Sequence, residues 1–394
     1  MKETRLIKTP EGVRDILPEE CEKKLLLERE LMETMGRFGF RPIETPTFEF
    51  FDLFSREIGT TPAKDLYKFF DREGNTLVLR PDVTPQIVRA FVSFRGEKNI
   101  PLRFSYRGNT YINHHSYTLR PKEITQVGAE LMGETGVQAD AEMIAMCVEC
   151  LKTAGLTEFQ IGIGHAGYLS ALTDSAGLIE EQKEELDELL NNRNYFGVTE
   201  MIKKQKLEPD LSFLFESLGD FYSSTEEMKE LMQRSARYPK VQEILNWLCT
   251  FDHMLSLYGV QSYVTYELGQ LPPFRYYTGI IFDGYTYDAP EPLVKGGRYD
   301  SLLRYFGNEE GALGFAFRLD TLQQALSRQH KGKMPKCEVE LMMYEENCLD
   351  EAIKAAKRLR EEGKQVELME YREGVREEVL SRYVRFTVIR EEKA

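Results

Sequence analysis

Apolar and polar residues alternate along two neighbouring segments, residues 101–111 and 121–132, with a short polar stretch between them. In the first segment the even positions from 102 to 106 are apolar and the odd positions are polar, which is the period of a β-strand. The polar residues 113–117 predict a turn. We therefore expect a long antiparallel hairpin on which Arg107, Gln126 and Glu130 share one face.

The expected hairpin face suits a small ligand that carries both an ammonium and a carboxylate. Glu130 can pair with the ammonium, and Arg107 can pair with the anion. Charged residues at alternate strand positions more commonly form a sheet face that is exposed to water. The alternation predicts the strands but does not decide between a binding site and a solvated surface.

The N-terminal part of the chain begins with a helical pattern and continues with an extended one. Apolar residues at helical spacing predict a helix over residues 19–38. Residues 42–50 are extended, and Pro46 inside them is typical of an edge strand or a kinked segment. Thr84 followed by Pro85 predicts the start of a helix, with the threonine as N-cap and the proline in the first turn.

The rest of the chain is expected to add strands around one helical insertion. Residues 173–250 are rich in Glu, Lys and Leu at helical spacing, so we expect helices with solvated charged faces there. His165 lies at an expected strand-to-helix junction, where a histidine is more often structural than a ligand. We expect an α+β core over residues 1–328 and a small α/β domain over residues 335–394. Further predicted elements are a hairpin at 69–79, a helix at 140–154, a strand and helix at 159–172 and strands at 263–288.

Composition narrows the classes of partner and cofactor. The 394 residues carry a formal net charge of −14, whereas proteins that hold nucleic acid usually display a basic face, so the charge argues against tRNA. Cys147 and Cys150 form a lone CxxC without further ligands at zinc-binding spacing, so we expect free buried thiols and no metal or cofactor. Neither a signal peptide nor a run of about 18 apolar residues is present, which predicts a cytoplasmic protein without a membrane span.

Several segments resemble the class II aminoacyl-tRNA synthetases in their histidyl version. TPEGVRDILP, residues 9–18, resembles the lead-in of that group. MGRFGFRPIETPTFEF, residues 35–50, resembles motif 1, and this resemblance implies a homodimer. The Tyr-Arg pair at 106–107, with the spaced Gln126 and Glu130, resembles motif 2. The implied fold is an antiparallel sheet flanked by helices.

Two further segments resemble the parts of the histidyl group that hold the amino acid. LRPDVTP, residues 79–85, resembles the family's RPEGT, with Asp82 in place of the glutamate. YYTG, residues 276–279, resembles the histidine-specific motif, whose tyrosines line the imidazole pocket. The resemblance implies a histidine site made of Asp82, Thr84, Arg107, Gln126, Glu130, Tyr276 and Tyr277.

The resemblance breaks at positions that organise ATP in the synthetases. Asn109 replaces the motif 2 glutamate, Pro272 replaces the arginine that activates the carboxylate, and Thr321 replaces the motif 3 arginine. Arg275 and Arg318 stand where the family has aspartate and glycine, and Arg318 is expected near the nucleotide. Because adenylation needs cations that stabilise the developing charge on the phosphate, these changes imply a protein without catalytic residues.

An amino-acid pocket retained beside an altered nucleotide site resembles the regulatory subunits of ATP phosphoribosyltransferase, over roughly residues 5–326. The resemblance implies that the short catalytic subunit is the partner, that it needs this chain for activity, and that L-histidine inhibits the complex. Such feedback requires that histidine bind one arrangement of the complex better than another. The alternatives are an active histidyl-tRNA synthetase and a synthetase-like sensor of histidine or tRNA.

Overall fold

The chain divides into two units, Met1–Lys333 and Met334–Ala394, and this division lies between the expected core (1–328) and the expected C-terminal domain (335–394). Part of the expected turn (115–117), Arg275, and residues 335–338, 372–382, 384 and 391–394 of the expected α/β domain lie outside the described residues. The computed structural model describes residues 8–55, 61–95, 100–114, 121–272, 276–287, 289–333, 339–371, 383 and 385–390.

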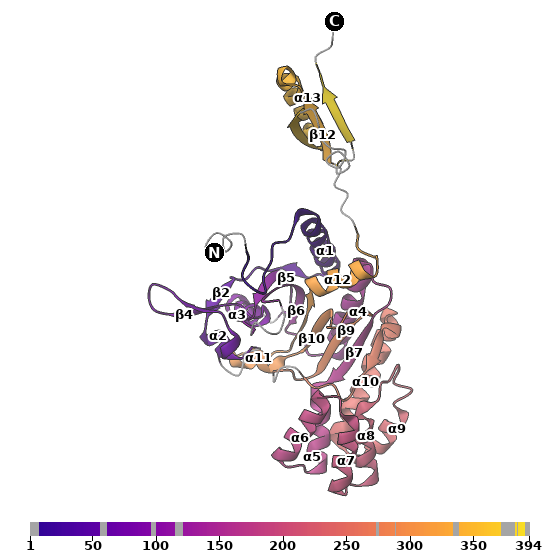
Figure 1. The fold of residues 1–394 in the computed structure, drawn as a ribbon. Helices are drawn as coiled ribbons and strands as arrows, with labels where there is room; N and C mark the ends of the chain where they lie inside the picture. Colours follow the sequence, from indigo (N-terminus) through magenta and orange to yellow (C-terminus); the bar gives the residue numbers. More distant parts are fainter. Residues whose placement is uncertain are drawn as a thin grey trace. The chain divides into compact units, whose positions relative to one another are not determined.

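An eight-stranded sheet forms the centre of the first unit (Figure 1). The outermost pairs, β1 with β5 and β7 with β8, are parallel, and every pair between them is antiparallel. This arrangement confirms the predicted α+β class with an antiparallel core. In spatial order the strands are β1 (Arg41–Pro42), β5 (Leu102–Tyr111), β6 (Glu123–Met132), β11 (Ala312–Arg318), β10 (Val294–Arg298), β9 (Ile280–Tyr285), β7 (Gln160–His165) and β8 (Val264–Tyr266).

Helices pack on both faces of this sheet. The odd positions of β6, such as Val127 and Leu131, join α1 (Pro18–Arg37) and α4 (Val137–Ala154) in the main hydrophobic core. On the opposite face, Tyr106 of β5 joins a second core with α3 and α11. The predicted helices at 19–38 and 140–154 are thereby confirmed. Further helices of these layers are α3 (Thr84–Arg95), α11 (Asp300–Tyr305) and α12 (Leu319–Arg328).

A helical insertion follows β7, as the sequence predicted. His165 ends the strand, and its Nδ1 accepts a hydrogen bond of 3.1 Å from the Gly167 N–H, so this histidine caps the next helix. Burial lowers the pKa of His165 to about 4, which keeps the ring neutral for this contact. The insertion contains α5 (Ala166–Ala176), α6 (Glu180–Asn191), α7 (Tyr195–Gln205), α8 (Pro209–Glu216), α9 (Lys229–Arg234) and α10 (Pro239–Tyr258).

A small antiparallel sheet lies beside α3 and confirms the predicted hairpin at 69–79. Its strands, in spatial order, are β2 (Phe48–Phe50), β4 (Thr76–Leu79) and β3 (Lys68–Phe70), and the short helix α2 (Asp52–Ser55) follows β2. Val78 is buried against Phe54 and Leu66 on one face of this sheet. The other face carries Phe48 and Phe50, each more than half exposed.

The C-terminal unit is a separate three-stranded parallel sheet with one described helix. Met342 and Val366 from the sheet pack against Ala352 and Ala356 of the helix in a small core. Parallel strands joined by a helix match the predicted α/β pattern of this segment. The spatial order is β13 (Gln365–Glu370), β12 (Val339–Tyr344) and β14 (Arg385–Ile389), and the helix is α13 (Leu349–Glu361).

Two expected absences can be examined in the part of the chain that the structure describes. No helix there is long and apolar enough to cross a membrane. No group of three or more His, Cys, Asp or Glu side chains is arranged to hold a metal ion among those residues. Cys147 and Cys150 are buried in α4 as free thiols, and burial raises the pKa of both.

Candidate functional site

A cavity of about 300 Å³ lies on the sheet face that α3 and α11 cover. Its lining comes from segments far apart in the sequence: the start of α3, β6, β11, and the residues next to β9 and β10. A pocket of this size suits a small metabolite. Six predicted histidine-site residues line it, namely Asp82, Thr84, Gln126, Glu130, Tyr276 and Tyr277.

Arg107 lies on the opposite face of the sheet, so its predicted place beside Gln126 and Glu130 is wrong. The register pairs Arg107 with Val127, whereas Gln126 is paired with Gly108. Residues directly opposite each other in an antiparallel pair share a face. The Arg107 guanidinium therefore points toward α1, where its Nη1 donates a 3.0 Å hydrogen bond to Glu28.

Glu130 is the most deeply buried acid of the cavity, with 1% of its surface exposed. Thr84 Oγ1 donates a 2.6 Å hydrogen bond to Glu130 Oε1, and the Tyr299 hydroxyl donates to Oε2. Burial raises the pKa of Glu130 to about 8, although these two donors oppose the shift. Gly314 is the cross-strand neighbour, and a Cβ there would lie 1.6 Å from Glu130 Oε2. Glycine at this position thus leaves room for the carboxyl group.

The start of α3 differs from the prediction in one detail. Asp82, not Thr84, caps the helix, because its Oδ1 accepts hydrogen bonds from the backbone N–H groups of Val83 (2.7 Å) and Thr84 (3.3 Å). The Thr84 side chain instead donates to Glu130, 46 residues along the chain. The Asp82 side chain is therefore held at the cavity wall by the backbone of α3, and the Thr84 side chain is held there by Glu130.

Three tyrosines form an aromatic wall around Glu130. The rings of Tyr276 and Tyr277 are 5.0 Å apart, and the rings of Tyr276 and Tyr299 are 6.0 Å apart, edge to face. Burial is the main cause that raises the pKa of all three hydroxyls, so they remain hydrogen-bond donors at neutral pH. Gly297 permits the close approach of Tyr277, since a Cβ there would lie 2.6 Å from its ring.

The cavity is also lined by charged residues that the sequence did not assign to the histidine site. Arg318, at the end of β11, forms an ion pair with Glu291. Lys295 Nζ lies 3.0 Å from Asp283 Oδ2. The alternation of β11 puts Gly314, Ala316 and Arg318 on the cavity side, so a strand pattern could have indicated Arg318. Tyr299 carries no local signal in the sequence.

The residues aligned with the synthetase ATP site are not gathered in this cavity. Asn109 was predicted to replace a nucleotide-binding glutamate, but it lies on the α1 face of the sheet. Its side chain donates to Glu123 and accepts from Thr125, and Thr125 in turn accepts from Lys24 of α1. Thr321 lies in α12 and is not among the residues that line the cavity.

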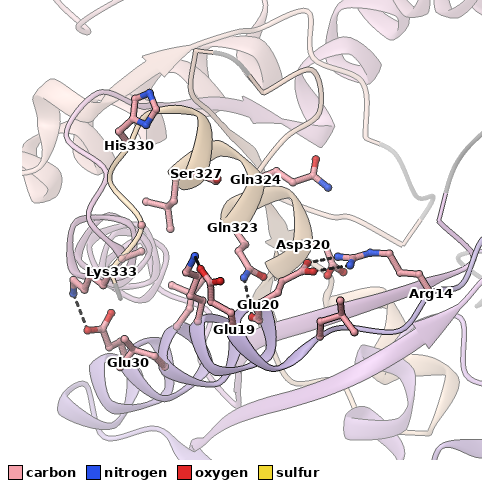
Figure 2. Close-up of a pocket in the computed structure, with 17 residues that line it drawn as sticks. Arg14, Glu19, Glu20, Glu30, Asp320, Gln323, Gln324, Ser327, His330 and Lys333 are labelled. Atoms are coloured by element: carbon pink, nitrogen blue, oxygen red, sulfur yellow. Dashed lines mark hydrogen bonds and ion pairs between the residues drawn. The ribbon is translucent and has the colours of Figure 1, made fainter. Parts of the chain in front are cut away.

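A second cavity, of about 630 Å³, lies between α1 and α12 (Figure 2). Charged side chains around it pair with one another: Arg14 with Glu20, Lys333 with Glu30 at 2.7 Å, and Lys23 with Glu19 at 2.8 Å. The cavity under α3 differs, because Gln126 Oε1 is buried there and has no hydrogen-bond partner among the described residues. A buried polar atom without a partner usually indicates a missing ligand or water. The smaller cavity is therefore the stronger candidate for a binding site.

Comparisons with known proteins show which families the chain is similar to. The family model described as Histidyl-tRNA synthetase matches residues 12–322. The chain is 36% identical, over 92% of its length and 86% of the relative's, to an ATP phosphoribosyltransferase regulatory subunit of Acetivibrio thermocellus. It is 34% identical to the protein of that name from Ruminiclostridium cellulolyticum, over 94% of this chain and 88% of the other.

The chain is also similar to solved structures of such proteins. A Bacillus halodurans protein, titled an ATP phosphoribosyltransferase regulatory subunit/histidyl-tRNA synthetase, superposes with a TM-score of 0.87 and 30% identity. The match covers 98% of this chain and 99% of the other. A histidyl-tRNA synthetase from Nostoc shares the fold at 18% identity, with a TM-score of 0.79 over 95% of this chain and 88% of the other.

Proposed function

The chain belongs to the family of ATP phosphoribosyltransferase regulatory subunits, and from this premise we propose that its α3 cavity binds L-histidine as a feedback signal. In this proposal the chain acts in the cytoplasm, the short catalytic subunit is its partner, and that subunit requires the chain for activity. Histidine then lowers the activity of the complex by favouring an inactive arrangement.

The imidazole of histidine fits the part of the cavity around the buried Glu130, which we call its inner end. In this proposal Glu130 pairs with an imidazole nitrogen instead of the ammonium that the strand pattern suggested, and the rings of Tyr276 and Tyr277 provide aromatic walls with polar tips. Because its carboxyl group is already held by Thr84 and Tyr299, Glu130 is positioned before the ligand arrives. This pre-positioned buried acid beside an aromatic wall is the observation that carries the proposal.

The ammonium of histidine fits the polar side of the cavity. Gln126 offers a buried amide oxygen without a partner among the described residues, and Asp82 offers a carboxylate at the start of α3. An ammonium has three N–H donors and no acceptor, so an arrangement of acceptors of this kind recognises it.

An active histidyl-tRNA synthetase is the alternative within the same fold. Adenylation would need cations on the phosphates. Pro272 carries no charge where the synthetases have an arginine, and Thr321 carries none in place of the motif 3 arginine. A clear histidine-dependent ATP–pyrophosphate exchange activity would support the synthetase and contradict our proposal.

A homodimer is part of the proposed function. Phe48, Phe50 and Phe69 lie on one face of the small sheet and are 54%, 54% and 37% exposed. Contiguous exposed aromatic residues commonly mark an interaction surface. Phe48 and Phe50 end the segment, residues 35–50, that resembles motif 1, and that resemblance implies a homodimer. We therefore propose that this face of the small sheet contacts a second copy of the chain.

Calorimetric titration of L-histidine tests the proposed pocket. We expect Glu130→Gln to weaken binding roughly 10- to 100-fold, because the amide cannot pass a proton to the imidazole and so cannot form the resulting charge-assisted hydrogen bond, worth about 1.5–3 kcal/mol. Tyr277→Ala should also weaken binding, because it removes one aromatic wall. Arg107→Ala is the matched control: it lies on the opposite sheet face and should leave the affinity unchanged. Unchanged affinity in both cavity variants would contradict the assignment of the pocket.

A further inference from the structure

We propose that Arg318 binds the α-carboxylate of the ligand, and that Glu291 occupies the same guanidinium when the cavity is empty. This inference rests on the proposed function, because it assigns the remaining group of a bound amino acid. It adds a subsite for the ligand carboxylate, in which Glu291 neutralises Arg318 until the ligand binds. Neither residue belongs to the histidine site that the sequence implied.

A bound amino acid needs a cation opposite its carboxylate. Arg107, which the sequence pattern assigned to the anion, faces α1, and Pro272 carries no charge where the synthetases have an arginine. Among the described residues that line the cavity, the lysine and arginine side chains are those of Lys295 and Arg318. The carboxylate partner is therefore sought between these two.

The sheet register puts Arg318 beside the ammonium acceptor. Arg318 on β11 is directly opposite Gln126 on β6, so their Cβ atoms are about 5 Å apart. The ammonium and carboxylate of an α-amino acid are attached to the same carbon, so their receptors must be neighbours. Gln126 Oε1 and Arg318 Nε are both buried without a hydrogen-bond partner among the described residues. A bound amino-acid head group would satisfy both atoms.

The inner end of the cavity lies further along the same two strands. Gly314 and its partner Glu130 are four residues from Arg318 and Gln126, about 13 Å along the strand. The side chains of Arg318 and Glu130 point into the cavity from these two positions, and a histidine between them can fill the remaining distance. The carboxylate would then lie toward Arg318 and the imidazole toward Glu130.

The two cations differ in how firmly their present partners are held. Glu291, the partner of Arg318, lies in the segment between β9 and β10, and its side chain is 38% exposed. Asp283, the partner of Lys295, is 12% exposed and also accepts a 3.1 Å hydrogen bond from the Tyr285 hydroxyl. The two pairs are similarly exposed as a whole, because Arg318 is 24% and Lys295 42% exposed, but Asp283 is less exposed than Glu291 and has a second donor. Glu291 is therefore the carboxylate that a ligand displaces more easily. Arg318 can also bind a carboxylate with two parallel hydrogen bonds, which Lys295 cannot.

Paired titrations with L-histidine and histamine test this assignment, because histamine lacks the carboxylate. We expect Arg318→Gln to weaken histidine binding roughly 10- to 100-fold and to leave histamine binding nearly unchanged. Glu291→Gln should strengthen histidine binding, since it removes the competing carboxylate, and should not affect histamine. Lys295→Gln is the matched control and should change the histidine-to-histamine ratio little.

The outcomes separate this inference from the proposed function. If the wild-type chain binds neither ligand, the proposed function itself is wrong. If the wild type binds histidine and Arg318→Gln does so equally well, the carboxylate assignment is wrong. A loss confined to Lys295→Gln would overturn it in favour of the lysine. Histamine binding by each variant reports an intact cavity, so an equal loss of both ligands in Arg318→Gln would also contradict a carboxylate-specific role.

Discussion

The protonation state of Glu130 is set by its burial in the cavity. The carboxyl group accepts hydrogen bonds from the hydroxyls of Thr84 and Tyr299, and no lysine or arginine among the described residues is bonded to it. Burial raises its pKa to about 8. At neutral pH the empty cavity therefore holds a mostly protonated acid. A ligand that brings a ring nitrogen to this group can share its proton.

The pH dependence of stability tests the state of Glu130. In the unfolded chain Glu130 loses its proton near pH 4.5, whereas in the folded chain it keeps the proton to about pH 8. The unfolded state thus binds fewer protons in this range, so Glu130 makes the folded chain less stable as pH rises. We expect Glu130→Gln to gain stability relative to wild type, by up to a few kcal/mol, between pH 5 and pH 8.

Chemical denaturation at the two pH values measures this difference. Asp140, whose pKa is raised to about 6 chiefly by burial, contributes a trend of the same sign, but it is present in both proteins and cancels in the comparison. A constant stability difference between variant and wild type across the range would show that Glu130 is ionised in the folded chain.

Arg107 shows which information a single strand pattern lacks. Period-two alternation states which residues of one strand share a face, but the register between two strands decides which faces coincide. Because residues 112–122 separate β5 from β6, the register could not be counted from the turn. The observed pairing of Gly108 with Gln126 moves Arg107 to the α1 face.

At the scale of elements, the patterns predicted the helices well and the contacts between strands poorly. The helix expected at 19–38 is observed as Pro18–Arg37, because its apolar spacing follows a buried helical stripe. Tyr299 and Arg318 reach the site through the order β6–β11–β10, which joins segments more than 150 residues apart. The spatial order of the strands cannot be predicted from the spacing of residues along the sequence.

Arg298 ties β10 to the start of α4. Its guanidinium lies 2.6 Å from Asp140, and these two side chains are 7% and 2% exposed. We expect Arg298→Met to destabilise the fold by about 3–5 kcal/mol, since it leaves Asp140 buried without its cation. Thermal unfolding measures the effect. Lys203→Met, which breaks an exposed ion pair with Glu200, is the control and should cost about 0–1 kcal/mol. Similar losses in the two variants would contradict the account.

At the scale of the whole molecule, the aromatic face of the small sheet predicts a dimer. We expect the double variant Phe48→Glu, Phe50→Glu to be monomeric at concentrations where the wild type is dimeric, because charges would lie in an apolar interface. Light scattering coupled to size exclusion measures the mass. Phe196→Glu, at an exposed aromatic residue of α7, should leave the dimer intact. A dimeric double variant would exclude this face as the contact.

The activity of the complex tests the central claim most directly. The short ATP phosphoribosyltransferase catalytic subunit from the same organism would be assayed with and without this chain across a histidine titration, alongside the Glu130→Gln variant. We predict that activity requires the chain, falls as histidine is added, and becomes less sensitive to histidine in the variant. Activity that is independent of the chain, or inhibition that is identical in the Glu130→Gln complex, would contradict the account.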